Sequence, residues 1–271
     1  MVSLLPRVQL FEWNDLPWVP AAVRDTVVES LSRTLQWGKM LDGMVAPFEK
    51  FLDEAGTREV LDLGAGGGGP ALILARAVTR AGRTPPRFIL TDLHPRVEAW
   101  CQAKAEQPGV IDYVPSSVDA TAIPRSLAHG RVRTVINVLH HFPPDLAAAI
   151  FADAVRSSRG IFVAEPFARN PLAFASFIPV GLPALVLNPL LSKKDRMTKA
   201  LLTWATPAAF AIGLWDGIVS TLREYTTDEL YAMVKPFGTP FRWGHGTYEF
   251  WPLGRYRYFW GVPRDRDTLA I

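Results

Sequence analysis

The glycine-rich stretch VLDLGAGGGGPALILARA, residues 60–77, constrains the fold of this chain more than any other feature. A short apolar run carrying Asp62 leads into five glycines around one alanine, and Pro70 then opens a segment with helical apolar spacing. Proline suits the first turn of a helix, because its φ is fixed at a helical value and its missing N–H is not needed there. The stretch therefore predicts a buried strand, a turn of bare backbone and a helix.

Two ligand-binding motifs overlap in this turn. Gly64, Gly66 and Gly69 satisfy G-x-G-x-x-G, in which bare backbone approaches the pyrophosphate of a dinucleotide. The spacing of Asp62, Gly64, Gly66 and Gly68 gives D-x-G-x-G-x-G, an S-adenosylmethionine signature. A pyrophosphate is usually bound with a Lys or Arg side chain nearby, and the turn itself contains neither residue. The composition of the turn thus favours adenosylmethionine.

Strand and helix patterns alternate after this turn. We predict strands at residues 59–63, 87–91, 110–114, 134–138 and 160–164, with helical patterns between most of them. Alternation of this kind predicts parallel strands joined by right-handed crossovers, in a doubly wound, mostly parallel α/β sheet of the Rossmann-like type. Near the C-terminus, two aromatic-rich runs around a Pro-Leu-Gly turn predict an antiparallel edge hairpin.

The pattern divides the chain into four regions. Helical apolar spacing in residues 1–56 predicts an N-terminal helical cap, and residues 57–166 form the cofactor-binding core. Residues 167–226 are an apolar helical lid insertion, and residues 227–271 supply the last helix and the edge hairpin that complete the core.

Polar residues follow the predicted strands, where an open parallel sheet binds its ligands. Asp92 follows the second strand, and its carboxylate suits two ribose hydroxyls. Asp119 follows the third strand at a position suited to an adenine amino group. Asn137, His140 and His141 follow the fourth strand.

This ordered set resembles class I S-adenosylmethionine-dependent methyltransferases, particularly the small-molecule type. The resemblance covers roughly residues 60–165 and returns in the edge hairpin, which suits that family's antiparallel last strand. The interval from Asp62 to Asp92 is longer than the roughly 20 residues usual between a glycine turn and its ribose acid, and we interpret the turn-rich TRAGRTPPR as an insertion. The resemblance implies that the cofactor is bound by Asp62, Gly64, Gly66, Gly68, Asp92, Leu93, Val118, Asp119, Ala120 and Asn137.

Methyl transfer from a sulfonium is an in-line displacement, so positioning supplies most of the acceleration. A hydroxyl acceptor must also lose a proton, and histidine is the side chain most easily poised to take it near neutral pH. We therefore predict His140 or His141 as a catalytic base, with a structural role in capping or packing as the alternative. The predicted substrate-binding residues are Glu165, Trp204, Trp215 and Tyr225, although Glu165 could equally fix the turn before Pro166.

Two long uncharged runs lie within residues 170–220. The first is long enough to cross a bilayer, but its prolines argue against a regular helix. We favour a lid over a hydrophobic substrate. A membrane-surface contact, with Lys193, Lys194, Arg196 and Lys199 near anionic headgroups, and a dimer interface are the alternatives.

Composition narrows the function further. The formal net charge is only +3 and the basic residues are mostly scattered, so nucleic acid is not the expected partner. Cys101 is the single cysteine, which excludes an internal disulfide and fits a cytoplasmic protein. The N-terminus does not resemble a signal peptide, and no compact metal-ligand spacing is present.

The sequence therefore predicts an adenosylmethionine-dependent methyltransferase acting on a hydrophobic small molecule. Oxygen is the expected acceptor atom, with carbon or nitrogen open. An NAD(P)-dependent oxidoreductase is the alternative, and a non-catalytic adenosylmethionine-binding or membrane-associated protein is the second alternative.

Overall fold

The computed structural model describes residues 5–265, so the first four and last six residues of the predicted outer regions lie outside it. The described chain forms two compact units. Unit 1 contains residues 5–40, 167–225 and 249–255, and unit 2 contains the remainder. Residues 167–225 of the predicted lid thus belong to one unit with residues 5–40. Residues 41–56 belong with the sheet, where Phe48 and Phe51 of helix α2 (Val45–Ala55) pack on Phe162.

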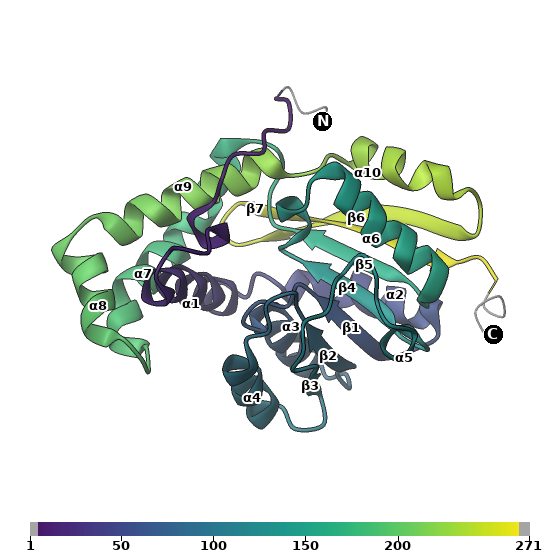
Figure 1. The fold of residues 1–271 in the computed structure, drawn as a ribbon, viewed down its shortest axis with the longest axis horizontal. Helices are drawn as coiled ribbons and strands as arrows, with labels where there is room; N and C mark the ends of the chain where they lie inside the picture. The colour runs from purple at the N-terminus through teal and green to yellow at the C-terminus, as the bar shows by residue number, and fades with distance from the viewer. Residues whose placement is uncertain (1–4, 266–271) are drawn as a thin grey trace. The chain divides into compact units, whose positions relative to one another are not determined.

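A seven-stranded sheet runs through unit 2 in the order β3-β2-β1-β4-β5-β7-β6 (Figure 1). The first five strands pair in parallel, and β7 pairs antiparallel to β5. This confirms the predicted mostly parallel sheet with an antiparallel edge hairpin. The strands are β1 (Glu59–Leu63), β2 (Arg87–Thr91), β3 (Ile111–Tyr113), β4 (Val132–Ile136), β5 (Ile161–Glu165), β6 (Phe241–Phe250) and β7 (Gly254–Pro263).

Strands β1 and β2 have the predicted bounds, whereas β4 begins and ends two residues earlier than predicted. The reason is Arg133, which lies within β4 and is fully buried although it is charged. Its Nη1 lies 2.6 Å from a carboxylate oxygen of Asp153 on helix α6 (Pro144–Ser157), so the buried charge has an opposite charge beside it. A hydropathy pattern cannot predict that a charged residue lies inside a strand, because its burial depends on a partner that is distant in the sequence.

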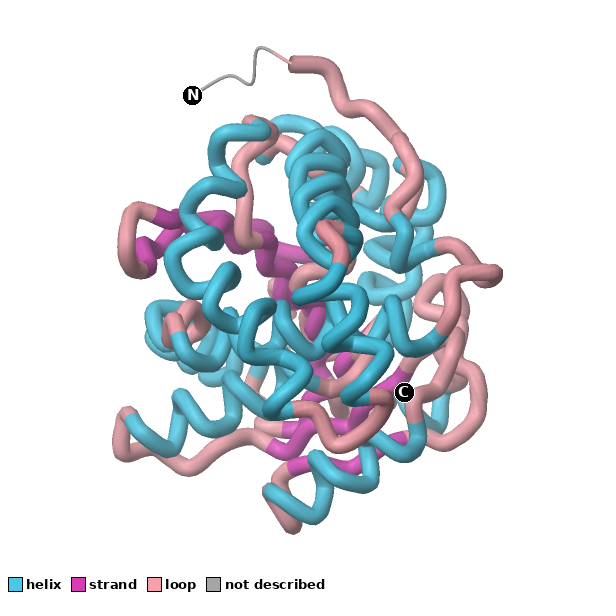
Figure 2. The backbone as a smooth tube through the Cα atoms, turned by 90° about the vertical axis from the view of Figure 1, so that its left-hand side faces the viewer, coloured by secondary structure: helices cyan, strands magenta, loops and turns pink. Residues whose placement is uncertain are grey.

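Helices lie beside the strands of the sheet; Figure 2 draws the helices in cyan and the strands in magenta. Helix α2 packs on α3, and α6 packs on α10. The aromatic cluster around Phe48, Phe51 and Phe162 lies in the core of this unit. The helices of unit 2 are α2 (Val45–Ala55), α3 (Gly69–Arg80), α4 (Val97–Glu106), α5 (Arg125–Ala128), α6 (Pro144–Ser157) and α10 (Thr227–Val234), with 3₁₀ turns at Asp42–Met44, Leu139–His141 and Lys235–Phe237.

Unit 1 is helical apart from the tip of the β6–β7 hairpin. Its helices are α1 (Ala21–Trp37), α7 (Ile178–Leu191), α8 (Arg196–Ala200) and α9 (Ala208–Arg223), with 3₁₀ turns at Trp13–Asp15 and Pro171–Phe177 and a π-helical segment at Leu201–Ala205.

The expectation that prolines prevent a regular helix in the apolar block is wrong for α7. This helix runs for 14 residues with Pro183 and Pro189 inside it. With the preceding 3₁₀ turn, Pro171–Leu191 is long and apolar enough to cross a membrane, and only 28% of its most apolar window is buried. Arg196–Ala205 and Ala208–Arg223 pass the same test only as a pair bent by 82°.

Candidate functional site

The glycine turn after β1 has the backbone that its sequence predicts. Gly64, Gly66 and Gly68 have φ values of 63°, 52° and 79°, in the left-handed region that glycine adopts without steric cost. A methyl group added at Gly68 would lie 2.8 Å from Leu90 and 3.3 Å from Trp100, so the close packing of these two side chains on the turn requires a glycine here. At Gly66 an added methyl group would meet no atom within 4 Å. Gly66 therefore presents bare backbone to open space.

Asp92, at the end of β2, is bonded directly to this turn. Its Oδ2 accepts a hydrogen bond of 2.9 Å from the Gly66 N–H, and its Oδ1 accepts one of 2.8 Å from the His94 N–H. A carboxylate has about four acceptor positions. Two of these acceptor positions are therefore used by the Gly66 and His94 N–H groups, and the two that remain suit the two hydroxyls of a ribose.

Trp100 holds the other side of the turn. Its indole N–H donates to the Gly66 carbonyl at 2.8 Å, and its ring is buried. The sequence analysis did not identify this residue as part of the site. Its position on α4, 34 residues from Gly66, gives no local signal of the contact.

Asp62 lies buried beneath the turn and accepts a hydrogen bond of 2.6 Å from the Thr134 hydroxyl of β4. The pKa of the Asp62 carboxyl is raised from 3.8 to about 7, because burial raises it, the bond from Thr134 lowers it by less, and the charge of Asp92 raises it. A cationic ligand near this carboxyl would favour its ionised form.

The segment after β3 joins the same edge of the sheet. The Val118 N–H donates to the Asp92 carbonyl at 2.9 Å, and the Ser117 hydroxyl donates to the Leu93 carbonyl at 2.7 Å. Asp119 is exposed, and its Oδ1 accepts hydrogen bonds from the N–H and the hydroxyl of Thr121. The structure therefore brings most of the predicted cofactor residues to one edge, with Asp119 and Ala120 following Val118 along the chain.

Asn137 follows β4 in a left-handed conformation, with φ of 60°. Its N–H donates to the Ala164 carbonyl at 2.9 Å, and its Oδ1 accepts a 3.0 Å bond from the hydroxyl of Tyr256 on β7. Tyr256 is a second residue that the sequence analysis missed, because it is 119 positions away.

His140 and Glu165 form a buried pair at the ends of β4 and β5. The ring Nδ1 of His140 lies 2.8 Å from Glu165 Oε2, and the His140 backbone N–H donates to Oε1 at 3.2 Å. The ring of His141 lies beside that of His140, with 4.3 Å between the centroids, and is half-buried. Glu165, predicted to contact substrate, therefore orients a histidine in this structure.

The other predicted substrate residues lie in unit 1. The Trp204 indole donates to the Val186 carbonyl at 2.9 Å, and the Trp215 indole donates to the Phe11 carbonyl at 2.9 Å. Tyr225 is buried, with the Arg7 guanidinium 4.3 Å from its ring centroid. Their predicted contact with substrate stays a prediction.

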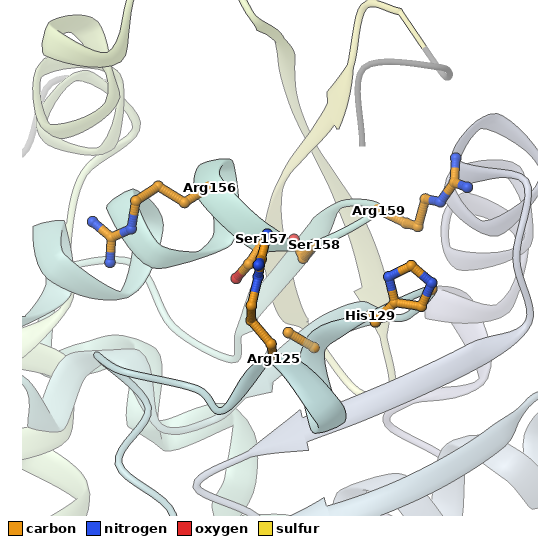
Figure 3. Close-up of a pocket in the computed structure, with 8 residues that line it drawn as sticks. Arg125, His129, Arg156, Ser157, Ser158 and Arg159 are labelled. Atoms are coloured by element: carbon orange, nitrogen blue, oxygen red, sulfur yellow. The ribbon is translucent and has the colours of Figure 1, made fainter. Parts of the chain in front are cut away.

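A small pocket of about 50 Å³ lies at the amino ends of β4 and β5, opposite to the carboxyl ends that carry Asp92 and His140 (Figure 3). Its lining includes Arg125, His129 and Gly130 before β4, and Ser158 and Arg159 before β5. It contains none of the predicted site residues, and ligands of open parallel sheets bind at the carboxyl ends. We therefore assign the candidate site to the carboxyl edge.

No protein-family model matches this chain, and no curated protein matches it in sequence. Among solved structures, it resembles an O-methyltransferase from neocarzinostatin biosynthesis, solved with S-adenosylmethionine and 2-hydroxy-5-methyl naphthoic acid. The TM-score is 0.51 and the identity 15%, over 93% of this chain and 60% of that one. Magnesium protoporphyrin IX methyltransferase from Synechocystis PCC 6803 is similar over 84% of each chain, with 14% identity and a TM-score of 0.46. The chain thus has the Rossmann-like fold of adenosylmethionine-dependent methyltransferases.

Proposed function

We propose that this chain is an S-adenosylmethionine-dependent methyltransferase. The observation that carries the proposal is the hydrogen bond between Gly66 and Asp92, which fixes a carboxylate beside open, bare backbone. The turn that contains Gly64, Gly66 and Gly68 would let the amino-acid end of the cofactor approach the backbone closely, where the Gly66 carbonyl can accept a second hydrogen bond, and Asp92 would hold the ribose. The neighbour from neocarzinostatin biosynthesis, which binds adenosylmethionine, supports this assignment.

The alternative, an NAD(P)-dependent oxidoreductase, has less support. The glycine turn contains no Lys or Arg that would accompany a pyrophosphate. The sheet also ends in an antiparallel β7 beside β5, whereas the usual dinucleotide fold continues with parallel strands in the order 3-2-1-4-5-6.

We further propose that the acceptor atom is a hydroxyl oxygen on a hydrophobic small molecule. Adenosylmethionine supplies an electrophilic methyl group when bound. A hydroxyl nucleophile must then lose its proton, and the His140–Glu165 pair is arranged to accept it. A neutral imidazole that donates from Nδ1 to Glu165 carries its acceptor lone pair on Nε2. An acceptor that is already anionic, or that has no proton to lose, has no need of this pair.

The chain's own contribution is positioning and proton removal. Asp92 and the glycine turn orient the cofactor, Glu165 holds the His140 ring, and water exclusion strengthens both interactions. The neighbour that binds 2-hydroxy-5-methyl naphthoic acid supports a small-molecule acceptor. A cytoplasmic location is also part of this proposal.

Calorimetric titration of the full chain tests the cofactor. We expect adenosylmethionine and its demethylated product, adenosylhomocysteine, to bind, and NADH and NADPH to give no heat of binding. Tight binding of a nicotinamide cofactor, or no binding of adenosylmethionine, contradicts the proposal.

The acceptor atom is tested with cofactor labelled in the methyl group and a panel of lipophilic phenols, anilines and carbon acids. Transfer to the phenol oxygen is the expected result. Label found only on carbon or nitrogen would leave the cofactor assignment intact and overturn the oxygen assignment.

A further inference from the structure

We infer that the outer face of α7 with α8 and the following π-helical segment docks flat on an anionic membrane surface. The inference concerns unit 1 alone and does not depend on the proposed methyl transfer. It begins with the apolar side chains that these elements leave in solvent.

Helix α7 presents one continuous apolar stripe. At 3.6 residues per turn its exposed apolar side chains cover a broad sector of about 220°, and the buried Ala184 and Asn188 lie outside that sector. The helix contains no charged residue. The stripe consists of Ile178, Leu182, Val186, Leu187, Leu190 and Leu191.

A second stripe borders the first. Met197, Leu201 and Trp204 follow at spacings of four and three residues and are 84%, 58% and 53% exposed. The Trp204 indole donates its N–H to the Val186 carbonyl at 2.9 Å, which fixes the second stripe against α7. We call the two stripes together the apolar face. Soluble monomers rarely leave contiguous apolar patches of such extent without a partner.

The inner side of α7 carries one buried polar residue, Asn188, and packs on α1. Asn188 is fully buried, accepts a hydrogen bond from Arg33 and donates to the Thr26 carbonyl at 3.4 Å. Lys199 donates to Glu29 of α1 at 2.8 Å. If α7 crossed a bilayer, these charged partners on α1 would enter the hydrocarbon with it, at high cost. The helix therefore suits a position parallel to the surface, with only its outer side in the lipid.

Exposed cations adjoin the apolar face. Lys193, Lys194 and Arg196 lie in or beside the turn between α7 and α8 and are exposed, with Asp195 as the one acid among them. Apolar side chains flanked by basic residues are the composition that binds anionic headgroups. Lys199, expected from the sequence to join these cations, is instead fully buried against Glu29. This charge favours an anionic lipid surface over a second copy of the same basic face.

Flotation of the full chain with vesicles tests the inference. We expect binding to phosphatidylcholine vesicles that contain phosphatidylserine, and weaker binding to phosphatidylcholine alone. Neutralising Lys193, Lys194 and Arg196 to Gln should weaken binding about fivefold per residue at low ionic strength. Leu190→Glu and Met197→Glu should each weaken it more than tenfold. Leu146→Glu on α6, an exposed leucine outside the apolar face, is the matched control and should bind like the wild type.

A fluorescence measurement covers the case in which a glutamate variant fails to fold. Cys101 is the single cysteine of the chain, so Cys101→Ser allows a polarity-sensitive probe to be attached at one new position. The probe on Leu190→Cys should shift to the blue when anionic vesicles are added, and the probe on Leu146→Cys should not.

Three results would overturn the inference: wild-type chain that does not float with anionic vesicles, equal flotation of the Leu190→Glu variant, or an unchanged probe at position 190. A dimer in sedimentation equilibrium that Leu190→Glu dissociates, without flotation of the wild type, would assign the face to self-association instead.

Discussion

Glu165 contacts His140 twice, through the ring Nδ1 at 2.8 Å and through the backbone N–H at 3.2 Å. One buried carboxylate thus fixes both the imidazole and the chain that carries it. The two residues come from the ends of neighbouring parallel strands, β4 and β5. This arrangement separates His140 from His141, which the sequence alone could not distinguish as candidate bases.

His140→Ala should lower the single-turnover rate about 10²–10⁴-fold while cofactor affinity is nearly kept, because a hydroxyl acceptor loses its base. The wild-type rate should fall at acid pH, since only neutral imidazole accepts a proton. His141→Ala is the control and should keep at least about a third of the rate. If His140→Ala keeps as much, proximity alone drives the reaction.

Glu165→Gln should lower kcat about tenfold or more with little change in KM, because the amide no longer favours the imidazolium that forms when His140 takes the proton. Glu165 acts here as a positioning residue. The discriminating readout is the acid limb of the pH–rate profile, which should move in Glu165→Gln. An unchanged profile with a proportionally lower thermal stability would show a purely structural role.

Asp92→Ala should weaken adenosylmethionine binding at least about tenfold, because two hydrogen bonds to a charged acceptor, worth roughly 1.5–3 kcal/mol each, are lost. The same substitution frees the Gly66 N–H, so the melting temperature of the unliganded variant must be measured beside the affinity. Asp145→Ala, an exposed acid on α6, is the control for charge. Unchanged affinity in Asp92→Ala would show that Asp92 does not bind the ribose.

Gly66→Val and Gly68→Ala should fail in different ways. At Gly66 the added side chain enters open space and strains a left-handed backbone, so we expect the thermal shift on adding adenosylmethionine to disappear. At Gly68 the methyl group meets Leu90 and Trp100, so the unliganded chain itself should melt at a lower temperature. A Gly66→Val variant that the ligand stabilises as strongly as the wild type would exclude Gly66 from the cofactor site.

Asp62→Asn should change the pH dependence of stability. The wild-type carboxyl has a pKa of about 7 when folded and an ordinary, lower pKa when unfolded, so folding takes up a proton between the two values. The wild-type free energy of unfolding therefore falls as the pH rises from about 4 to 7, and the full shift corresponds to on the order of 4 kcal/mol. Asn does not titrate, so the variant should gain stability relative to the wild type on going from pH 5 to pH 8. Urea unfolding of both proteins at the two pH values measures this, and an equal difference at both would refute the role of Asp62.

The sequence by itself determined the parts of this protein that depend on short-range pattern. Alternating apolar runs and helical spacing were enough to predict β1 and β2 with their observed bounds. The run from Asp62 to Gly68 was enough to predict the turn, because positive φ is a property of single residues. The order of the parallel strands then brought Asp92 to that turn, since carboxyl ends of parallel strands meet at one edge.

Only the tertiary structure decided which polar groups become partners. The pairs His140 with Glu165, Asn137 with Tyr256, and Lys199 with Glu29 join residues 25, 119 and 170 positions apart. A buried polar or charged group is stable only when a partner satisfies it, and that partner is supplied by the packing of distant elements rather than by neighbours in the chain. Lys199 and Arg133 are buried for the same reason, because Glu29 and Asp153 supply the opposite charges.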